Sequence, residues 1–226
     1  MKDKLLFILR KIGAFFSFVW TEMIKFPAYI LVHPLKGFEE FKRYGRSRYS
    51  VAVAFLIITI TLQILKFQVN GFLVNDTNIR DLKSFSQVIY FGGGVVVLTA
   101  ANWSITTLFD GKGKVGDIFK MICYCLYPMI WAKGVGMILS NILTKEEMGI
   151  FQLVNSLGTF LAVYLFFFGI ISIHEYNLTQ TLLTILFTIV AVLIILFVGI
   201  LLFDLFQKVY GFFYQVYQEI TLRDLL

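Results

Sequence analysis

The sequence predicts an all-α membrane protein, a polytopic bundle of five transmembrane helices with amphipathic interfacial helices at both ends. Of its 226 residues, 58% are hydrophobic and only 15% are charged, whereas a soluble globule carries roughly 25% charged residues. The hydrophobic residues also gather in five long runs. Each run is near the roughly 20 residues that a helix needs to cross a bilayer, and helices satisfy their own backbone groups in lipid.

Residues 1–26 are the first predicted element, an amphipathic helix lying in the membrane interface. Apolar residues recur along it at helical spacing, and most of its polar side chains lie off that stripe. A cleaved signal peptide is the competing interpretation, but the apolar run 5–9 is short and no A-x-A site follows it. We expect Pro27 and Pro34 to end the helix and residues 27–48 to form a basic cytoplasmic link.

The end of that link is rich in arginine and lysine and directly precedes an apolar run. Its basic side chains are Lys42, Arg43, Arg46 and Arg48. Such a cluster holds its end of a span in the cytoplasm and lies near anionic headgroups. We therefore predict lipid headgroup contact here, and a site for one specific lipid is the sharper alternative.

The five-span domain is predicted over residues 49–206. Its helices are expected at 49–65, 85–108, 118–140, 148–173 and 182–203. The links between them are short, which favours antiparallel neighbours in a bundle. In this topology thirteen basic residues lie on the side of the N-terminus and six on the other side. The positive-inside rule then places the N-terminus in the cytoplasm and the C-terminus outside the plasma membrane.

Residues that could perform chemistry are sparse. The sequence has no HExxH, G-x-S-x-G or P-loop pattern. Cys123 and Cys125 are two residues apart on a predicted helix and do not face each other, and the two histidines are isolated. We therefore predict no enzyme activity, no cofactor and no metal site. Because the basic residues flank apolar runs, the bilayer is a better partner for them than nucleic acid.

One predicted span contains a lysine. Lys133 lies in the third span, and an ionisable group inside a membrane marks a functional hypothesis. Its side chain could reach the outer interface by itself. The alternative is an ion pair in the membrane with Asp204, which lies at a similar predicted depth at the end of the fifth span.

Proline and glycine residues predict where these helices bend or approach one another. Pro128 removes a backbone hydrogen bond in the middle of the third span and should kink it. Gly134 and Gly136 follow it, and the run Gly92 to Gly94 lies in the second span. Close helix packing is the expected role of these glycines, and a helix break that lines a cavity is the alternative.

Residues 207–226 form a predicted aromatic, amphipathic tail. Its aromatic side chains follow helical spacing at Tyr210, Phe213, Tyr214 and Tyr217. Tyrosine is enriched at membrane interfaces, so the stripe suits a helix lying on the bilayer. The same stripe could instead be a docking surface for another membrane protein.

An ordered set of short motifs resembles the Yip domain family, in its bacterial branch, over roughly residues 30–210. The motifs are His33-Pro34, Gly37-Phe38, Asn102-Trp103, the segment Thr107 to Gly113 with Asp110 and Gly111, Tyr127-Pro128, Gly169, and Ile173 to Tyr176 with His174. The resemblance implies five transmembrane helices with a cytoplasmic N-terminus. Eukaryotic relatives act in vesicle traffic and bind small GTPases and one another. Bacterial relatives often accompany carbohydrate importers of the ATP-binding-cassette class.

These observations favour a non-enzymatic membrane scaffold or accessory subunit. Its expected partners are the lipid bilayer and other integral membrane proteins, with an ATP-binding-cassette importer suggested by the resemblance. A solute transporter or channel is the first alternative, motivated by Pro128, the Gly92 to Gly94 run and Lys133. A membrane-shaping or lipid-binding protein is the second, motivated by the basic stretch and the amphipathic ends.

Overall fold

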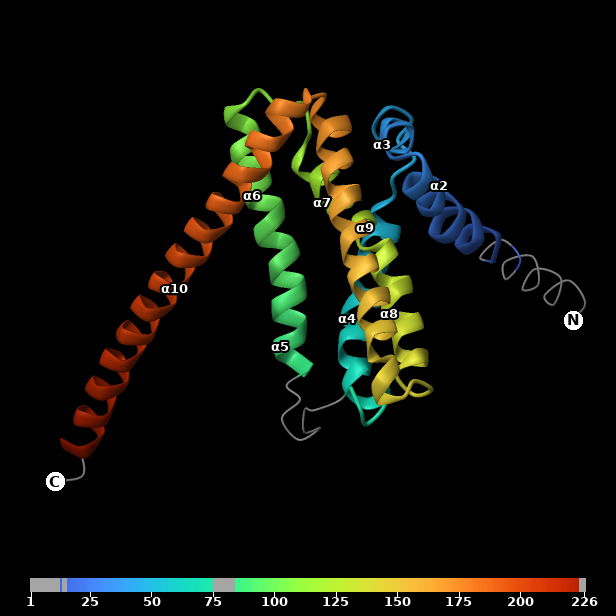
Figure 1. The fold of residues 1–226 in the computed structure, drawn as a ribbon. Helices are drawn as coiled ribbons and strands as arrows, with labels where there is room; N and C mark the ends of the chain where they lie inside the picture. The colour runs from blue at the N-terminus through green and yellow to red at the C-terminus, as the bar shows by residue number, and fades with distance from the viewer. Residues whose placement is uncertain (1–12, 14–15, 75–83, 224–226) are drawn as a thin grey trace, which may run out of the picture.

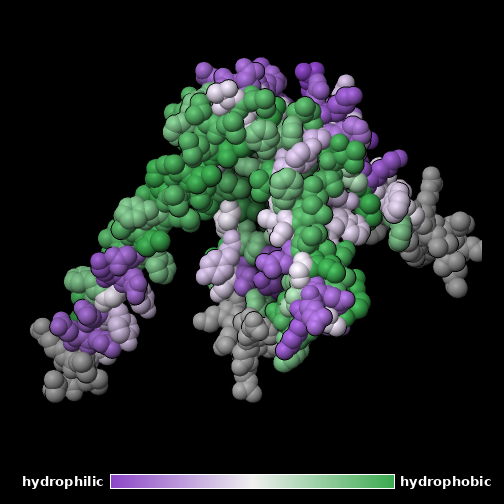
Figure 2. Space-filling view, in the orientation of Figure 1, coloured by the Kyte–Doolittle hydropathy of each residue, from purple (hydrophilic) through white to green (hydrophobic). Residues whose placement is uncertain are grey.

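The computed structural model describes residues 13, 16–74 and 84–223, and these residues are mainly helical, with no β-strand among them. Within the described residues, five helices are long and apolar enough to cross a membrane, which confirms the predicted all-α fold with five helices of spanning length. Hydrophilic residues gather at the two ends of the molecule, and hydrophobic residues cover the surface between them (Figure 2). The N-terminal interfacial helix was expected mainly at residues that lie outside the described ones.

The five spans follow one another up and down in Figure 1. In chain order they consist of α4 (Tyr49–Val69), α5 (Ser84–Val88) with η3 (Ile89–Gly93) and α6 (Gly94–Leu108), α7 (Val115–Cys125) with α8 (Tyr127–Leu139), η4 (Lys145–Glu147) with α9 (Met148–His174), and α10 (Leu178–Arg223). The spans therefore begin and end within a few residues of the predicted bounds, except for the last one.

The segment predicted as a link before the first span is helical in most of its length. A π-helix, η1 (Val19–Lys25), leads directly into α2 (Phe26–Val32), and α3 (Pro34–Arg43) follows after a break at His33. Pro34 lies in the first turn of α3, where a missing backbone N–H costs nothing, whereas Pro27 lies at the change from η1 to α2 and does not interrupt the helical run. The prediction that Pro27 ends a helix and opens a link is therefore wrong.

This N-terminal region also supplies part of the hydrophobic core. The ring of Tyr124 in α7 is met edge-on by Phe26 of α2, Phe41 of α3 and Phe55 of α4, at centroid distances of 6.2, 5.1 and 5.3 Å. All four side chains are buried. Edge-to-face aromatic pairs add to the free energy gained by burial. Residues 26–43 are therefore packed onto the bundle.

The third span is divided at Leu126. The N–H of Leu126 donates to the carbonyl of Cys123 at 3.2 Å, and a new helix starts with Pro128 in its first turn. A proline cannot donate a backbone hydrogen bond, so the division lies where the sequence places it. The first half, α7, lies at the centre of the bundle, and seven of its eleven residues are buried.

The last helix is the main departure from prediction. α10 contains 46 residues and runs without a break through position 207, where a separate tail helix was expected. No proline interrupts it, and the polar residues near position 207 are compatible with a helix. Figure 1 shows α10 packed beside α6 near its start and diverging from the bundle toward the C-terminus.

Candidate functional site

The loop after α6 and the end of α9 meet at one end of the bundle. A β-carbon on Gly111 would lie 2.6 Å from Nδ1 of His174 and 2.7 Å from the hydroxyl of Tyr176. One on Gly113 would lie 2.7 Å from Cε1 of His174. These contacts are too short for any side chain larger than a hydrogen atom. Glycine at both positions therefore allows the loop to close over His174.

His174 is almost fully buried under that loop, with 2% of its surface exposed. Its ring stacks on Tyr176 at a centroid distance of 5.3 Å, and its Nδ1 accepts a hydrogen bond from the N–H of Gly113 at 3.4 Å. An accepting Nδ1 assigns the proton of a neutral imidazole to Nε2. The histidine therefore serves as a packing surface and a backbone acceptor in this arrangement.

Tyr176 closes the same contact from the other side. Its hydroxyl donates to the carbonyl oxygen of Phe109 at 3.1 Å and lies 3.3 Å from that of Thr106. The carbonyl of Thr106 also accepts the N–H of Gly111 at 2.8 Å, so the tyrosine hydroxyl and the loop backbone together satisfy the carbonyls at the end of α6. Burial and the nearby carboxylate of Asp110 raise the pKa of Tyr176, so its hydroxyl stays a donor.

Glu175 joins three segments through its carboxylate. Oε1 lies 3.0 Å from Nζ of Lys42 in α3, and Oε2 lies 2.6 Å from Nζ of Lys112 in the loop. Lys42 also donates to the carbonyl oxygen of Ile173 at 2.8 Å, at the end of α9. The hydrogen bonds from Lys112 and Lys42 lower the pKa of Glu175 to about 2, so the carboxylate is ionised at neutral pH.

The backbone is strained where these groups meet. Glu175 and Asp110 have φ angles of 59° and 55°, in the left-handed region that glycine or asparagine usually occupies. At Glu175 this conformation ends α9 and turns the chain toward Tyr176, whose N–H reaches the carbonyl of Ile171 at 3.2 Å. We call the assembly of Lys42, Gly111, Lys112, Gly113, His174, Glu175 and Tyr176 the His174 latch.

The structure separates the other motif residues from the latch. Asn102 is fully buried in α6, and its amide donates to the hydroxyl of Thr188 in α10 at 3.2 Å. It is therefore a contact between α6 and α10. Trp103, the next residue, is 45% exposed on the outside of α6. The family-like motifs thus belong to two separate structural features. One is the loop that closes over His174, and the other is the contact between α6 and α10.

The basic residues before the first span have partners within the chain. Lys42 belongs to the latch, Arg43 pairs with Glu39 at 3.0 Å, and Arg46 pairs with Glu40 at 2.8 Å. The guanidinium groups of Arg46 and Arg48 also lie 5.1 Å from the rings of Phe26 and Phe18. Arg43 keeps 67% of its side chain exposed, so headgroup contact stays a prediction for this end.

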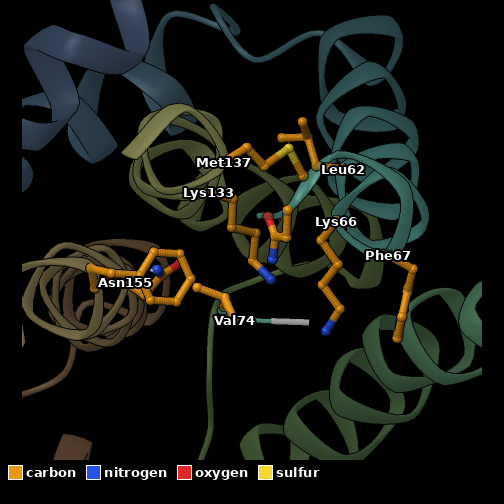
Figure 3. A pocket seen from close by; sticks show the side chains of 9 residues that line it. Leu62, Lys66, Phe67, Val74, Lys133, Met137 and Asn155 are labelled. Atoms are coloured by element: carbon orange, nitrogen blue, oxygen red, sulfur yellow. Dashed lines mark hydrogen bonds between the residues drawn. The ribbon is translucent and has the colours of Figure 1, made fainter. Parts of the chain in front are cut away.

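The proposed pair of Lys133 with Asp204 is corrected by the structure. Asp204 pairs with Lys208 one turn later in α10, at 2.7 Å, while Nζ of Lys133 lies 5.6 Å from the ring of Phe91. The two residues were expected at similar depths, but every residue of α10 from 196 to 210, including Asp204, is exposed. Lys133 instead points into a pocket between α4, α8 and α9 (Figure 3).

The glycines predicted to mediate helix packing differ in their surroundings. Gly136 faces Asn155 and Phe151 of α9, so a β-carbon there would be crowded. Gly93, Gly94 and Gly134 have open space, and Gly92 has only the tip of Ile60 at 4.0 Å. The run Gly92 to Gly94 instead coincides with the end of the π-helix η3. Sequence reasoning missed Gly158, whose β-carbon would overlap that of Ala132 in α8.

The aromatic stripe of α10 lies on the exposed part of the helix. Its four side chains are between 52% and 72% exposed: Tyr210, Phe213, Tyr214 and Tyr217. The rings of Tyr210 and Tyr214 stack at 6.4 Å, and Gln218 donates to the hydroxyl of Tyr214 at 3.1 Å. Elsewhere in the described part of the chain, no three His, Cys, Asp or Glu side chains gather into a group that could hold a metal ion.

Comparison with known proteins agrees with this arrangement. The Yip1 domain matches residues 28–200, a range that begins in α2 and ends within α10. It therefore includes most of α2, all of α3 and all residues of the His174 latch. No curated protein and no solved structure shows significant similarity to the chain. Since the match extends over most of the sequence, the chain belongs to the Yip1 domain family of membrane proteins.

Proposed function

We propose that this protein is a non-enzymatic membrane scaffold or accessory subunit that binds a partner membrane complex through α10. The observation that supports this proposal is the exposure of that helix. Its buried residues are Thr181, Thr184 and Thr188, which all lie in its first three turns. From Leu196 to Thr221 every residue except Gly211 is exposed.

The length of α10 adds to this argument. A helix of 46 residues extends for about 69 Å at 1.5 Å per residue, more than twice the roughly 30 Å of a hydrocarbon core. The apolar part can lie in lipid, but the part after Asp204 continues into a polar and aromatic sequence. Most of the stability of a helix in a protein comes from packing of its amphipathic face, and this segment has no such packing within the described residues. A partner surface or the membrane interface would stabilise this segment.

The aromatic stripe favours a protein partner for that segment. Tyr210, Phe213, Tyr214 and Tyr217 lie on one face of α10, and an amphipathic helix binds a groove through side chains at this spacing. Tyrosine and other large aromatic residues also dominate the binding energy at protein interfaces. An ATP-binding-cassette carbohydrate importer is the partner class that the family resemblance suggests.

Two neighbouring phenylalanines allow a matched test. Phe213 belongs to the stripe, while Phe212 lies on the opposite face and is 61% exposed. The full-length protein would be purified from its native membranes in nanodiscs, and co-purifying proteins would be quantified by mass spectrometry. We expect a stoichiometric membrane complex with the parent protein and with Phe212→Ser. Phe213→Ser should lower the amount of that complex severalfold.

Two outcomes would contradict the proposal. The protein could be recovered alone or only with further copies of itself, or Phe212→Ser could lower recovery of the complex as much as Phe213→Ser does. Either result would remove the support for a different membrane protein bound at the stripe. Solute flux and liposome remodelling by the purified protein would then test the transporter and membrane-shaping alternatives.

A further inference from the structure

A cavity of about 300 Å³ lies between the last turns of α4 and α8 and the first turns of α9, whereas the His174 latch lies at the other end of α9. Its lining combines two lysines and two asparagines with apolar side chains. Lys66 enters from α4 and Lys133 from α8, and Figure 3 shows both ammonium groups directed into the same space. The cavity and its two lysines are independent of the proposed role of α10.

The cavity is positively charged without a visible counter-charge. Among the described residues neither Lys66 nor Lys133 has a carboxylate partner within ion-pair distance. Each ammonium lies near an aromatic ring, at 4.9 Å from Phe67 and 5.6 Å from Phe91. A ring attracts a cation through its quadrupole but does not neutralise it. Two like charges in one partly enclosed space also repel each other.

Lys120 shows how the same bundle treats another lysine within a span. It lies in α7, pairs with Asp117 at 3.0 Å and donates to the hydroxyl of Ser47 at 2.8 Å. Its charge is therefore compensated within the chain. Lys66 and Lys133 lie at comparable distances from a helix end, yet their compensating groups are not among the described residues. Asp76 and Asp81 follow Val74 in the chain but lie outside the described residues, and a bound anion is the other group that would compensate both lysines.

The position of the cavity indicates which anions can reach it. Lys66 lies three residues before the end of α4, and Lys133 lies six residues before the end of α8. These separations correspond to about 5 and 9 Å along the helices, so the cavity lies near the depth of the lipid headgroups. Its volume of about 300 Å³ is at the lower end of small-molecule sites.

We propose that Lys66 and Lys133 form a binding site for a phosphate group. Phosphate oxygens accept charge-assisted hydrogen bonds from ammonium groups, and one phosphate can accept bonds from both lysines. The phosphate can belong to the headgroup of an anionic lipid or to a small soluble anion. Both sources share the same recognition chemistry, and they are separated by experiment.

The first measurement uses full-length protein in phosphatidylcholine nanodiscs and inorganic phosphate as the probe. Phosphate should raise the melting temperature of the parent protein saturably, because a ligand that binds only the folded state stabilises it. Chloride at equal ionic strength should not. The variant Lys66→Met/Lys133→Met should bind at least about tenfold more weakly, since charge-assisted hydrogen bonds are lost. Lys145→Met, an exposed lysine at the same end, should bind like the parent.

The second measurement tests the lipid source. The same proteins would be placed in nanodiscs that contain phosphatidylglycerol, and the lipid retained after detergent extraction would be counted by native mass spectrometry. Retention by the parent and by Lys145→Met, with loss in the double variant, assigns the site to a headgroup. Saturable inorganic phosphate binding with the same variant pattern assigns it to a soluble anion.

The variants also control for misfolding. Replacing a membrane lysine by methionine removes a costly charge, so the double variant should melt in phosphatidylcholine at or above the parent temperature. Lys133→Arg keeps the charge and should keep the binding. If neither anion distinguishes the parent from the folded double variant, the cavity is not a phosphate site.

Discussion

The His174 latch and the exposed part of α10 both contain charged and aromatic side chains, but their contacts connect different parts of the chain. In the latch, Lys42 reaches Ile173 across 131 residues and Lys112 reaches Glu175 across 63. In α10, Asp204 pairs with Lys208 four residues away, and Tyr214 accepts from Gln218 four residues away. The same residue types therefore join distant segments in one region and only neighbouring turns in the other.

This difference separates residues that maintain the fold from residues that are free to bind. A latch residue contributes to tertiary structure, and its replacement should lower the free energy of unfolding. An exposed residue of α10 contributes little beyond its own helix, and its replacement should act on binding instead. Substitutions in the two regions test this division.

The largest effect is expected at Gly111. In Gly111→Ala the new methyl group would meet His174 and Tyr176 at distances that require one of them to move. Overpacking of this kind costs about 1–3 kcal/mol, so the free energy of unfolding, measured by denaturant titration in detergent micelles, should fall by that amount. Equal stability of Gly111→Ala and the parent would show that the loop does not close over His174.

Gly134 is the matched control for this substitution. A β-carbon there meets no atom within 4 Å, and replacing a glycine inside a helix by alanine stabilises by about 0.5–1 kcal/mol. Gly134→Ala should therefore be as stable as the parent or slightly more stable. The opposite signs of the two glycine variants would sharpen the distinction between crowded and open positions.

An intermediate effect is expected from acid at Glu175. Its pKa is lowered in the folded protein from 4.5 to about 2, chiefly by the hydrogen bond from Lys112 and then by the one from Lys42. The ion pairs therefore stabilise the fold fully above pH 4.5, and this stabilisation is lost as the pH falls toward 2. The melting temperature of the parent should fall over that range.

The variant Glu175→Gln tests whether Glu175 causes this acid dependence of the melting temperature. It cannot titrate, so the part of the dependence that comes from the latch should be missing, while Glu146→Gln should behave like the parent. Glu146 is exposed and has no ion pair among the described residues. An unchanged acid dependence in Glu175→Gln would mean that other carboxylates produce it.

Features that depend on residues close together in the sequence are predicted well, and features that depend on contacts between distant residues are not. Spans are predicted well because the length and hydropathy of a segment are local properties. The latch glycines are recognisable as a motif, but nothing local shows that Gly113 lies against His174, 61 residues later. At residues 27–48 the prolines predict a link, but most of the segment is helical because it buries an apolar face. Phe38 and Phe41 are spaced as on one helix face, and both are buried.

The smallest effect is expected at Asp204, where prediction from depth alone was wrong. Its carboxylate is 55% exposed and pairs with Lys208 of the same helix, and exposed pairs at this spacing contribute about 0.3–0.5 kcal/mol. Asp204→Asn should therefore change the free energy of unfolding by no more than about 0.5 kcal/mol, and Lys208→Gln should have a similar effect. A loss of several kcal/mol would place α10 against the bundle and return Lys133 as the partner of Asp204. A small loss, together with an unchanged amount of co-purifying complex, would confine the contacts of Asp204 to its own helix.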